Sequence, residues 1–231
     1  MGWGTPIAAF FDRTKINVEN RARGGRSSRT YLTEGLWDQV LAALRPGDFV
    51  LMQFGHNDGG SLTEGRARAS LKGTGDETQE VENKTTGRKE VVHTYGWYLR
   101  KYIADARARG AMPIVLSPVP RNIWKDGKVV RAANDYGKWA AEAAKAGGAF
   151  FIDLNEIVAR HYEEAGPEKV QALYFTATDH THTTPAGAQL NAASVVEGLR
   201  GLKDCPLAAY LLDKPQTNAV PASGAPAAPI K

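Results

Sequence analysis

The stretch DFVLMQFG, residues Asp48–Gly55, decides how the chain is expected to fold. Its apolar residues run without alternation from Phe49 to Met52, and a Pro-Gly pair precedes them. A short apolar run between turn signals is typical of a strand that is buried on both faces, as in a parallel sheet. Polar residues follow at once, in HNDGG at 56–60, so this strand is expected to deliver side chains to the edge of the sheet.

The same alternation of apolar runs and amphipathic segments extends along the chain. Further short apolar runs predict strands at Lys15–Asn20, Met112–Val119 and Ala149–Leu154. Segments with helical periodicity predict helices at Leu36–Leu44, Tyr95–Arg109, Asp135–Ala146, Asn155–Glu164 and Pro185–Leu202. Strands that alternate with helices predict an α/β domain with a mostly parallel sheet.

One domain, residues 1–213, is expected to carry this pattern. Asn57–Thr94 interrupts it and is predicted to be an inserted loop followed by a β-hairpin. Thr183 or Thr184 is expected to cap the last helix, with Pro185 at its first position. From Lys214 to Lys231 the chain is rich in Pro and Ala without apolar periodicity, which predicts a disordered tail.

The composition limits the classes of function. The 231 residues carry a net charge of +4, which suits an acidic partner such as a polyanionic carbohydrate. Lys and Arg are scattered rather than gathered on one element, which argues against a nucleic-acid binder. No apolar run approaches the roughly 18 residues of a membrane span, and no signal peptide opens the chain. The single cysteine, Cys205, excludes an internal disulfide and is interpreted as structural. The oligomeric state is not predicted.

Three polar clusters follow predicted strands or precede the last helix: RGGRSS at 23–28, FGHNDGG at 54–60 and DHTH at 179–182. Ligands of open α/β sheets bind at the carboxyl ends of the strands, so the three clusters are expected to form one site.

The DHTH cluster allows three interpretations. Asp179 and His182 could form a general base and the carboxylate that orients it. His180 and His182 could instead bind zinc with His56 or Asp58, although no HExxH or CxxC spacing supports a metal. The cluster could also satisfy the hydrogen bonds of an ordinary turn.

The other two clusters are equally open to interpretation. The Asn57 side chain could stabilise an oxyanion, or it could begin a turn. Gly24 and Gly25 could permit a tight loop, or could let a backbone N–H approach a developing negative charge. Ser27 and Ser28 lie nearby, but nothing marks either as an activated nucleophile.

Taken together, the motifs resemble a known family. GWG (2–4), GGRSSRTYLTEGLW (24–37), PGDFVLMQFGHNDGG (46–60) and DHTHTTPAGAQLNA (179–192) are similar, in order and spacing, to the rhamnogalacturonan acetylesterases of the SGNH (GDSL-type) hydrolase superfamily. The resemblance covers nearly all of Gly2–Leu202 and implies a three-layer αβα, flavodoxin-like fold without a cofactor or metal. It also implies an exported or periplasmic esterase that acts on an acetylated acidic polysaccharide.

The resemblance assigns roles to particular residues. His182 would be the general base and Asp179 its orienting carboxylate, while the Gly25 N–H and the Asn57 side chain would bind the oxyanion. His180 would be a neighbour without a catalytic role. His56 and the loop PVPRNIWKDG, with Arg121 and Trp124, would line the substrate side.

The nucleophile of this family lies in a Gly-Asp-Ser motif at the end of a first strand ahead of GWG, and this sequence contains no such motif. We therefore expect an incomplete chain that lacks an inner strand of the sheet and, as given, lacks activity. The alternatives are a carbohydrate-binding relative without catalysis, another SGNH esterase or lipase, and a metal-dependent hydrolase that uses His56, His180 and His182.

Overall fold

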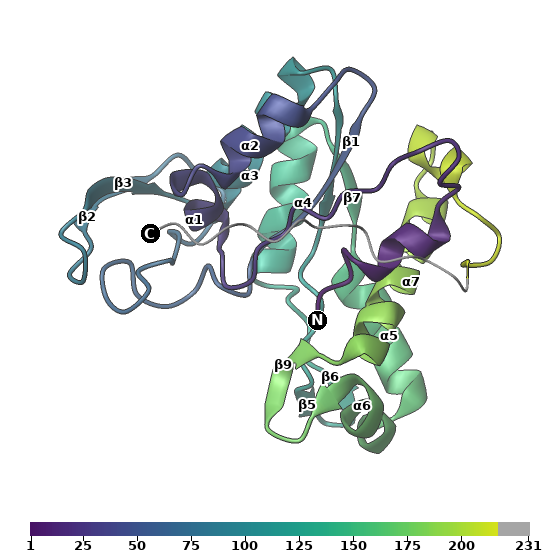
Figure 1. Ribbon diagram of the computed structural model, residues 1–231. Coiled ribbons are helices and arrows are strands. Elements are labelled where there is room, and N and C mark those ends of the chain that lie inside the picture. Colours follow the sequence, from purple (N-terminus) through teal and green to yellow (C-terminus); the bar gives the residue numbers. More distant parts are fainter. Residues whose placement is uncertain (217–231) are drawn as a thin grey trace, which may run out of the picture.

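The computed structural model describes residues 1–216 and has a parallel sheet at its centre. Three strands form it in the order β1 (Phe49–Gln53), β4 (Met112–Leu116) and β7 (Phe150–Ile152). Leu51 lies opposite Ile114, and Leu116 lies opposite Ile152. The strands predicted in these three regions are confirmed, and the sheet that they form lies between two layers of helices (Figure 1).

Alternate residues of the central strand belong to different cores. Val115 points to one core and Ile114 and Leu116 point to the other, as the two-residue repeat of a strand requires. The first core is covered by α1 (Ser28–Thr33), α2 (Leu36–Ala43), α3 (Tyr95–Ala108) and α4 (Tyr136–Gly147). The second is covered by η1 (Pro6–Phe10), α5 (Leu154–Ala165), α7 (Pro185–Gly201) and η2 (Pro206–Tyr210). The three-layer architecture expected from the sequence is therefore present, and the five predicted helices are confirmed to within one residue at each end.

The strand predicted at Lys15–Asn20 is wrong. Ile16 and Val18 pack against the second core and their neighbours are exposed, so the segment has the alternation of a strand. Among residues 1–216 it pairs with no strand, however, and a strand needs a backbone hydrogen-bond ladder as well as an alternating pattern. Consequently β1 pairs only with β4 in the described part of the chain, and its other edge is open.

The insertion contains the predicted hairpin. Its strands β2 (Thr78–Glu82) and β3 (Lys89–His93) are antiparallel and project from the body of the molecule (Figure 1). Arg29 joins them to the core: its side chain is fully buried, bonds to Glu90 of β3 at 2.6 Å and donates to the Ala69 carbonyl oxygen at 2.8 Å.

Several short elements lie at the carboxyl end of the sheet and were not predicted. They are β5 (Trp124–Lys125), β6 (Lys128–Val129), α6 (Pro167–Tyr174), β8 (Phe175–Thr176) and β9 (Asp179–Thr183). The tail predicted from Lys214 lies outside the described residues, except for 214–216, where the Gln216 N–H donates to the Ala9 carbonyl oxygen at 2.8 Å. Within residues 1–216 no helix has the length and apolar character to cross a membrane.

Candidate active site

Asp179 and His182 form a hydrogen-bonded pair on one strand. The DHTH cluster lies in strand β9, whose pairing with β8 contains an irregularity between Phe175 and Thr176. The His182 Nδ1 lies 2.7 Å from the Asp179 Oδ2, while the Oδ1 accepts from the backbone N–H groups of His182 at 2.9 Å and Thr181 at 2.7 Å. These bonds, the backbone donors first, hold the Asp179 pKa below its ordinary value. The carboxylate is therefore ionised and orients the imidazole.

Both ends of β9 are tied to neighbouring elements. The His180 carbonyl oxygen accepts from the Asn122 N–H at 2.8 Å. At the other end, the Thr183 hydroxyl donates to the Met1 carbonyl oxygen at 2.7 Å. Helix α7 then starts at the expected cap, because the Thr184 Oγ accepts from the Gly187 N–H at 3.2 Å and Pro185 occupies the first turn. The pair thus stands on a short strand whose ends are fixed.

His56 lies beside the pair and is a hydrogen-bond donor. Its Nε2 is 2.9 Å from the Val119 carbonyl oxygen, and because a carbonyl only accepts, the proton is on Nε2. Burial, the Arg121 guanidinium and, to a smaller extent, His182 lower the His56 pKa to about 4. Within residues 1–216 no group of three His, Cys, Asp or Glu residues has the geometry to hold a metal ion.

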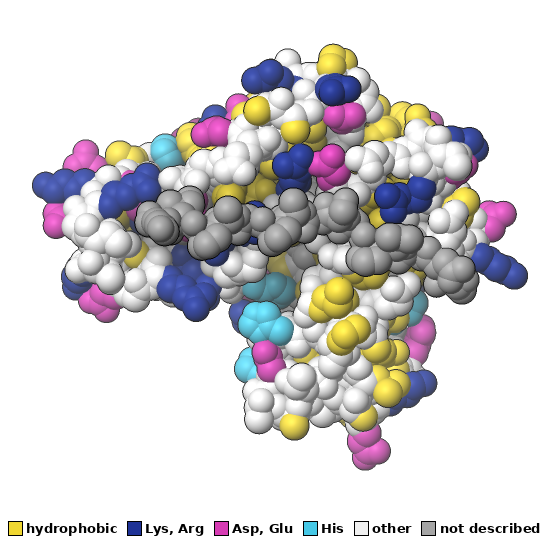
Figure 2. Space-filling model, in the orientation of Figure 1, with side chains coloured by type: hydrophobic (Ala, Val, Ile, Leu, Met, Phe, Trp, Pro, Cys, Tyr) yellow, Lys and Arg dark blue, Asp and Glu magenta, His cyan; other side chains and the backbone are white. Residues whose placement is uncertain are grey.

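Gly25 and Asn57 come together although their loops are distant in the sequence. The Asn57 Nδ2 donates to the Arg26 carbonyl oxygen at 2.9 Å. Gly25 has a φ of +79°, and a Cβ at this position would lie 3.1 Å from an Arg66 nitrogen, so both the backbone and its surroundings favour glycine. Because His56 and Asn57 are adjacent, the turn after β1 links this pair to the histidines. Figure 2 shows histidine side chains gathered beside an acidic side chain on one face of the molecule.

Asp58 is a buried carboxylate whose role was not predicted. It accepts hydrogen bonds from the Ser28 N–H at 3.0 Å, the Gly55 N–H at 3.0 Å and the Ser70 hydroxyl at 3.1 Å, as well as from the Ser28 hydroxyl. The residue has no solvent exposure, and burial raises its pKa to about 6 in spite of these donors. Asp58 thereby fixes the turn after β1 to the start of α1, and with it Asn57 to Gly25.

The two serines of the first loop are structural. Ser27 and Ser28 are both fully buried. The Ser27 Oγ caps α1 and lies 3.1 Å from the Thr30 hydroxyl, while the Ser28 hydroxyl donates to Asp58. Neither hydroxyl is directed at His182.

Arg121 and Trp124, both predicted on the substrate side, differ in exposure and in hydrogen bonding. Arg121 is exposed and its Nη2 donates to the His56 carbonyl oxygen at 3.4 Å. Trp124 lies in β5, packs against the second core and donates its indole N–H to the Asn122 Oδ1 at 2.7 Å. The arrangement leaves the Arg121 guanidinium available to a ligand, whereas the Trp124 N–H is already used.

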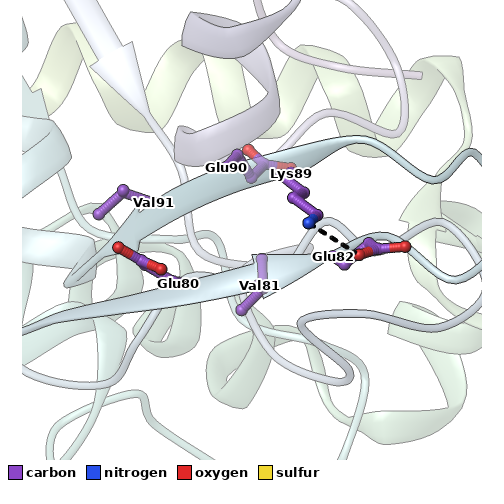
Figure 3. Close-up of a pocket in the computed structure, with 6 residues that line it drawn as sticks. All are labelled: Glu80, Val81, Glu82, Lys89, Glu90 and Val91. Atoms are coloured by element: carbon purple, nitrogen blue, oxygen red, sulfur yellow. Dashed lines mark ion pairs between the residues drawn. The ribbon is translucent and has the colours of Figure 1, made fainter.

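Depressions lie on two parts of the described surface. One, of about 220 Å³, adjoins His56 and Arg121 and continues past Tyr136 toward Ile123 and Val130. The other, of about 390 Å³, lies on the β2–β3 hairpin, where Glu80, Glu82 and Glu90 dominate its lining (Figure 3). The hairpin projects away from β9, so only the first depression belongs to the site (Figure 1).

Known proteins share both the sequence and the fold of this chain. A rhamnogalacturonan acetylesterase of Emericella nidulans is 33% identical over 198 residues, which are 86% of this chain and 78% of that protein. The probable rhamnogalacturonan acetylesterase YesY of Bacillus subtilis is 32% identical over 204 residues, covering 87% of this chain and 84% of that protein.

Two solved structures are similar in fold to this chain. The crystal structure of YxiM from Bacillus subtilis is similar with a TM-score of 0.68 and 25% identity, and the match covers 87% of this chain but only 50% of YxiM. Axe2, an acetylxylan esterase from Geobacillus stearothermophilus, has the same fold with a TM-score of 0.51 at 16% identity, covering 82% of this chain and 72% of Axe2. Residues 1–190 match the GDSL-like lipase/acylhydrolase family, and the chain therefore belongs to that family.

Proposed function

We propose that this protein is a carbohydrate O-acetylesterase that removes acetyl groups from an acetylated pectic polysaccharide by a Ser/His/Asp mechanism. The observation that carries the proposal is the His182–Asp179 pair, with 2.7 Å between Nδ1 and the carboxylate. The two relatives named as rhamnogalacturonan acetylesterases support the substrate class. A net charge of +4 favours approach to a polymer of acidic sugars, and because such a polymer is met outside the cytoplasm, we also propose export.

The pair supplies the proton transfers. With the Nδ1 proton donated to Asp179, the Nε2 of a neutral His182 is a free acceptor. It takes the proton of the serine hydroxyl as the oxygen attacks the acetyl carbonyl carbon. It then gives this proton to the sugar oxygen as the ester bond breaks, so that the sugar leaves with a free hydroxyl. Water then attacks the acetyl-enzyme by the same route, and acetate leaves. Asp179 stays ionised throughout because its pKa is lowered, and it stabilises the imidazolium that forms.

Gly25 and Asn57 would stabilise the charge on the carbonyl oxygen. The Gly25 N–H makes no hydrogen bond among the described residues, and a glycine lets a ligand approach the backbone closely. The Asn57 amide uses one N–H for Arg26 and retains a second. A donor that is preorganised in this way contributes on the order of a hundredfold or more in rate.

We propose that the serine comes from a segment of the natural polypeptide outside these 231 residues, on a strand that pairs with the open edge of β1. Within residues 1–216 the hydrogen bonds of the His182 ring end at Asp179. Ser27 and Ser28 are buried and their hydroxyls are engaged. The free edge of β1 exposes unpaired backbone groups, which favour an added strand. A strand there would end near Gly55 and His56, beside the base.

Acetate release from acetylated, rhamnogalacturonan-rich pectin tests the proposal. The assay compares this chain with a form extended by the residues encoded upstream, each with and without His182→Ala. His161→Ala is the matched control, because His161 also pairs with a carboxylate, Glu197, at 2.7 Å on a remote face. We expect activity in the extended form, a loss of about a thousandfold or more with His182→Ala, and little change with His161→Ala.

Other outcomes would change the proposal in defined ways. Activity of this chain alone that depends on His182 would refute an external serine but retain the esterase. A folded extended form that binds pectic fragments without releasing acetate would replace the esterase with a carbohydrate-binding protein.

A further inference from the structure

We propose that the depression beside His56 is a binding subsite for a hexuronate residue adjacent to the acetylated sugar, with Arg121 as the residue that binds its carboxylate. This inference rests on the proposed function for the position of the acetylated sugar. Three features of the depression support the subsite itself: one unpaired cation, two unused polar groups and an apolar rim.

Arg121 is the cation of this depression that has no acidic partner among the described residues. Its one hydrogen bond, to the His56 carbonyl oxygen, is long at 3.4 Å. Arg131 lines the same depression but bonds to Glu156 at 2.9 Å and also to Glu163, so its charge is neutralised. A guanidinium that is free of acidic partners is suited to bidentate binding of a carboxylate.

Arg121 is also close to the base. Its charge lowers the His56 pKa, and His182 acts on His56 in the same direction. A carboxylate bound by Arg121 would therefore lie next to the sugar whose acetyl group reaches His182.

Two further polar groups face the depression without partners. The Tyr136 hydroxyl makes no hydrogen bond to the described residues and lies 3.4 Å from where a Cβ on Gly59 would stand. Asp135 occupies the cap position of α4, yet its side chain makes no capping bond, which is unusual for Asp at this position. Both are suited to the hydroxyls of a sugar ring, with Asp135 as acceptor and Tyr136 as donor or acceptor.

The floor and rim complete the shape. A Cβ at Gly55 would meet Pro118 at 2.8 Å and Tyr136 at 3.1 Å, so glycine lets these two lining residues pack closely against the end of β1. Ile123 and Val130 are 41% and 45% exposed and are joined by a backbone hydrogen bond of 2.9 Å. Exposed apolar side chains at the rim of a polar depression are typical of a ligand site, and here they suit the C–H face of a pyranose ring.

The hairpin depression does not compete for this ligand. Its carboxylates outnumber its single lysine, Lys89, which already lies 3.8 Å from Glu82 (Figure 3). An acidic sugar would be repelled there. The charges that line the two depressions therefore favour Arg121, and not the hairpin, as the place where an acidic ligand binds.

Binding of trigalacturonate to this chain tests the subsite without requiring catalysis. The titration is followed by ¹H–¹⁵N NMR, with the neutral xylotriose as comparison. We expect shifts at Arg121, Ile123, Val130 and Tyr136, and a preference for trigalacturonate that weakens with salt. Arg121→Gln should weaken trigalacturonate binding roughly tenfold and leave xylotriose binding unchanged. Arg121→Lys should restore part of the loss, because it keeps the charge but not the planar fork.

Arg160→Gln is the control for net charge, because Arg160 is exposed and lies on α5, paired with Glu197 at 3.1 Å. It should leave both affinities unchanged. Equal binding of the two sugars, equal effects of Arg121→Gln and Arg160→Gln, shifts confined to other regions, or no shifts at all would each overturn the inference. Since no acetate is released in this titration, these outcomes are independent of whether the protein is an esterase.

Discussion

The two halves of the site are built in opposite ways. The half at the end of β1 is held by Asp58, a carboxylate without solvent exposure that joins segments 12 to 30 residues away. The half on β9 is held by Asp179, whose side chain is 35% exposed and whose partners lie two and three residues along the chain. The His182 side chain is 81% exposed.

Because of this difference, we expect the two halves of the site to contribute differently to stability and to the reaction. Exposed groups with local partners contribute little to the free energy of unfolding, whereas a buried group that satisfies several donors contributes much. We therefore expect substitutions on β9 to change the reaction and those around Asp58 to change the fold.

The largest effect is expected from Asp179→Asn. The Asn side chain would present an N–H to the His182 Nδ1 and favour the tautomer with the proton on Nε2, which cannot act as a base. Acetate release by the extended form should fall about a thousandfold or more, while the free energy of unfolding should change by no more than about 0.5 kcal/mol. ¹⁵N NMR of the His182 ring in this chain checks the tautomer directly. An unchanged tautomer, or a large loss of stability, would contradict the expectation that substitutions on β9 change the reaction and not the fold.

The next effect is expected from Asp58→Ala. Removing the carboxylate leaves the Ser28 and Gly55 N–H groups and two hydroxyls without acceptors inside the protein. Each buried donor without a partner costs about 1–3 kcal/mol, so a loss of roughly 3 kcal/mol or more is expected in urea unfolding at pH 7. Asp179→Ala is the matched control and should cost about 0.5 kcal/mol or less. Similar losses for the two variants would refute the division between buried and exposed halves.

The pH dependence of the free energy of unfolding also tests the contribution of the buried Asp58 carboxyl. Burial raises the Asp58 pKa in the folded protein from 3.8 to about 6, so between these values the folded state binds a proton that the unfolded state has released. The contribution of Asp58 is therefore fully present below about pH 4 and is lost as the pH rises through 6. One pKa unit corresponds to about 1.4 kcal/mol, which gives a change of about 3 kcal/mol across this window.

Asp58→Asn isolates this contribution, because the variant cannot titrate. The stability of the natural protein relative to Asp58→Asn should be greatest near pH 4 and should fall by pH 7, as measured by urea unfolding at both values. A difference between the two proteins that is independent of pH would contradict the raised pKa.

The contrast also explains which features could be predicted from the sequence. The Asp179–His182 pair was proposed because its members are three residues apart, so local geometry brings them together. The role of Asp58 was not predicted, because its carboxylate meets its donor on Ser28 only when the turn after β1 packs on α1. Arg29 was missed for the same reason, because its partner Glu90 is 61 residues away. Their significance depends on tertiary packing, which periodicity does not encode.

The helices and strands also differ in whether local sequence patterns or non-local contacts determine them. Helices and the strands of the central sheet carry strong local patterns and were predicted closely, as was the Thr184 cap. Lys15–Asn20 has the alternation of a strand but lacks a partner, and pairing is a non-local property. Strand β8 has only two residues, too few to give a pattern. Helix α6 did carry a signal, Gly166 followed by Pro167, that marks a helix start.

The smallest effect compares two helix caps, one in each half. The Ser27 Oγ accepts from the Thr30 N–H at 3.1 Å within a reciprocal capping box and is fully buried. The Thr184 Oγ caps α7 next to β9 at 3.2 Å in a partly exposed position. A lost cap costs about 0.5–2 kcal/mol, and burial raises the cost because water cannot replace the lost bond. Ser27→Ala should therefore lie near the upper end of this range and Thr184→Ala near the lower, as measured by urea unfolding. Ser27→Thr and Thr184→Ser keep the hydroxyl and should recover most of each loss, although added volume at the buried site limits the first. Equal costs at the two caps would mean that the exposed half is as firmly built as the buried one.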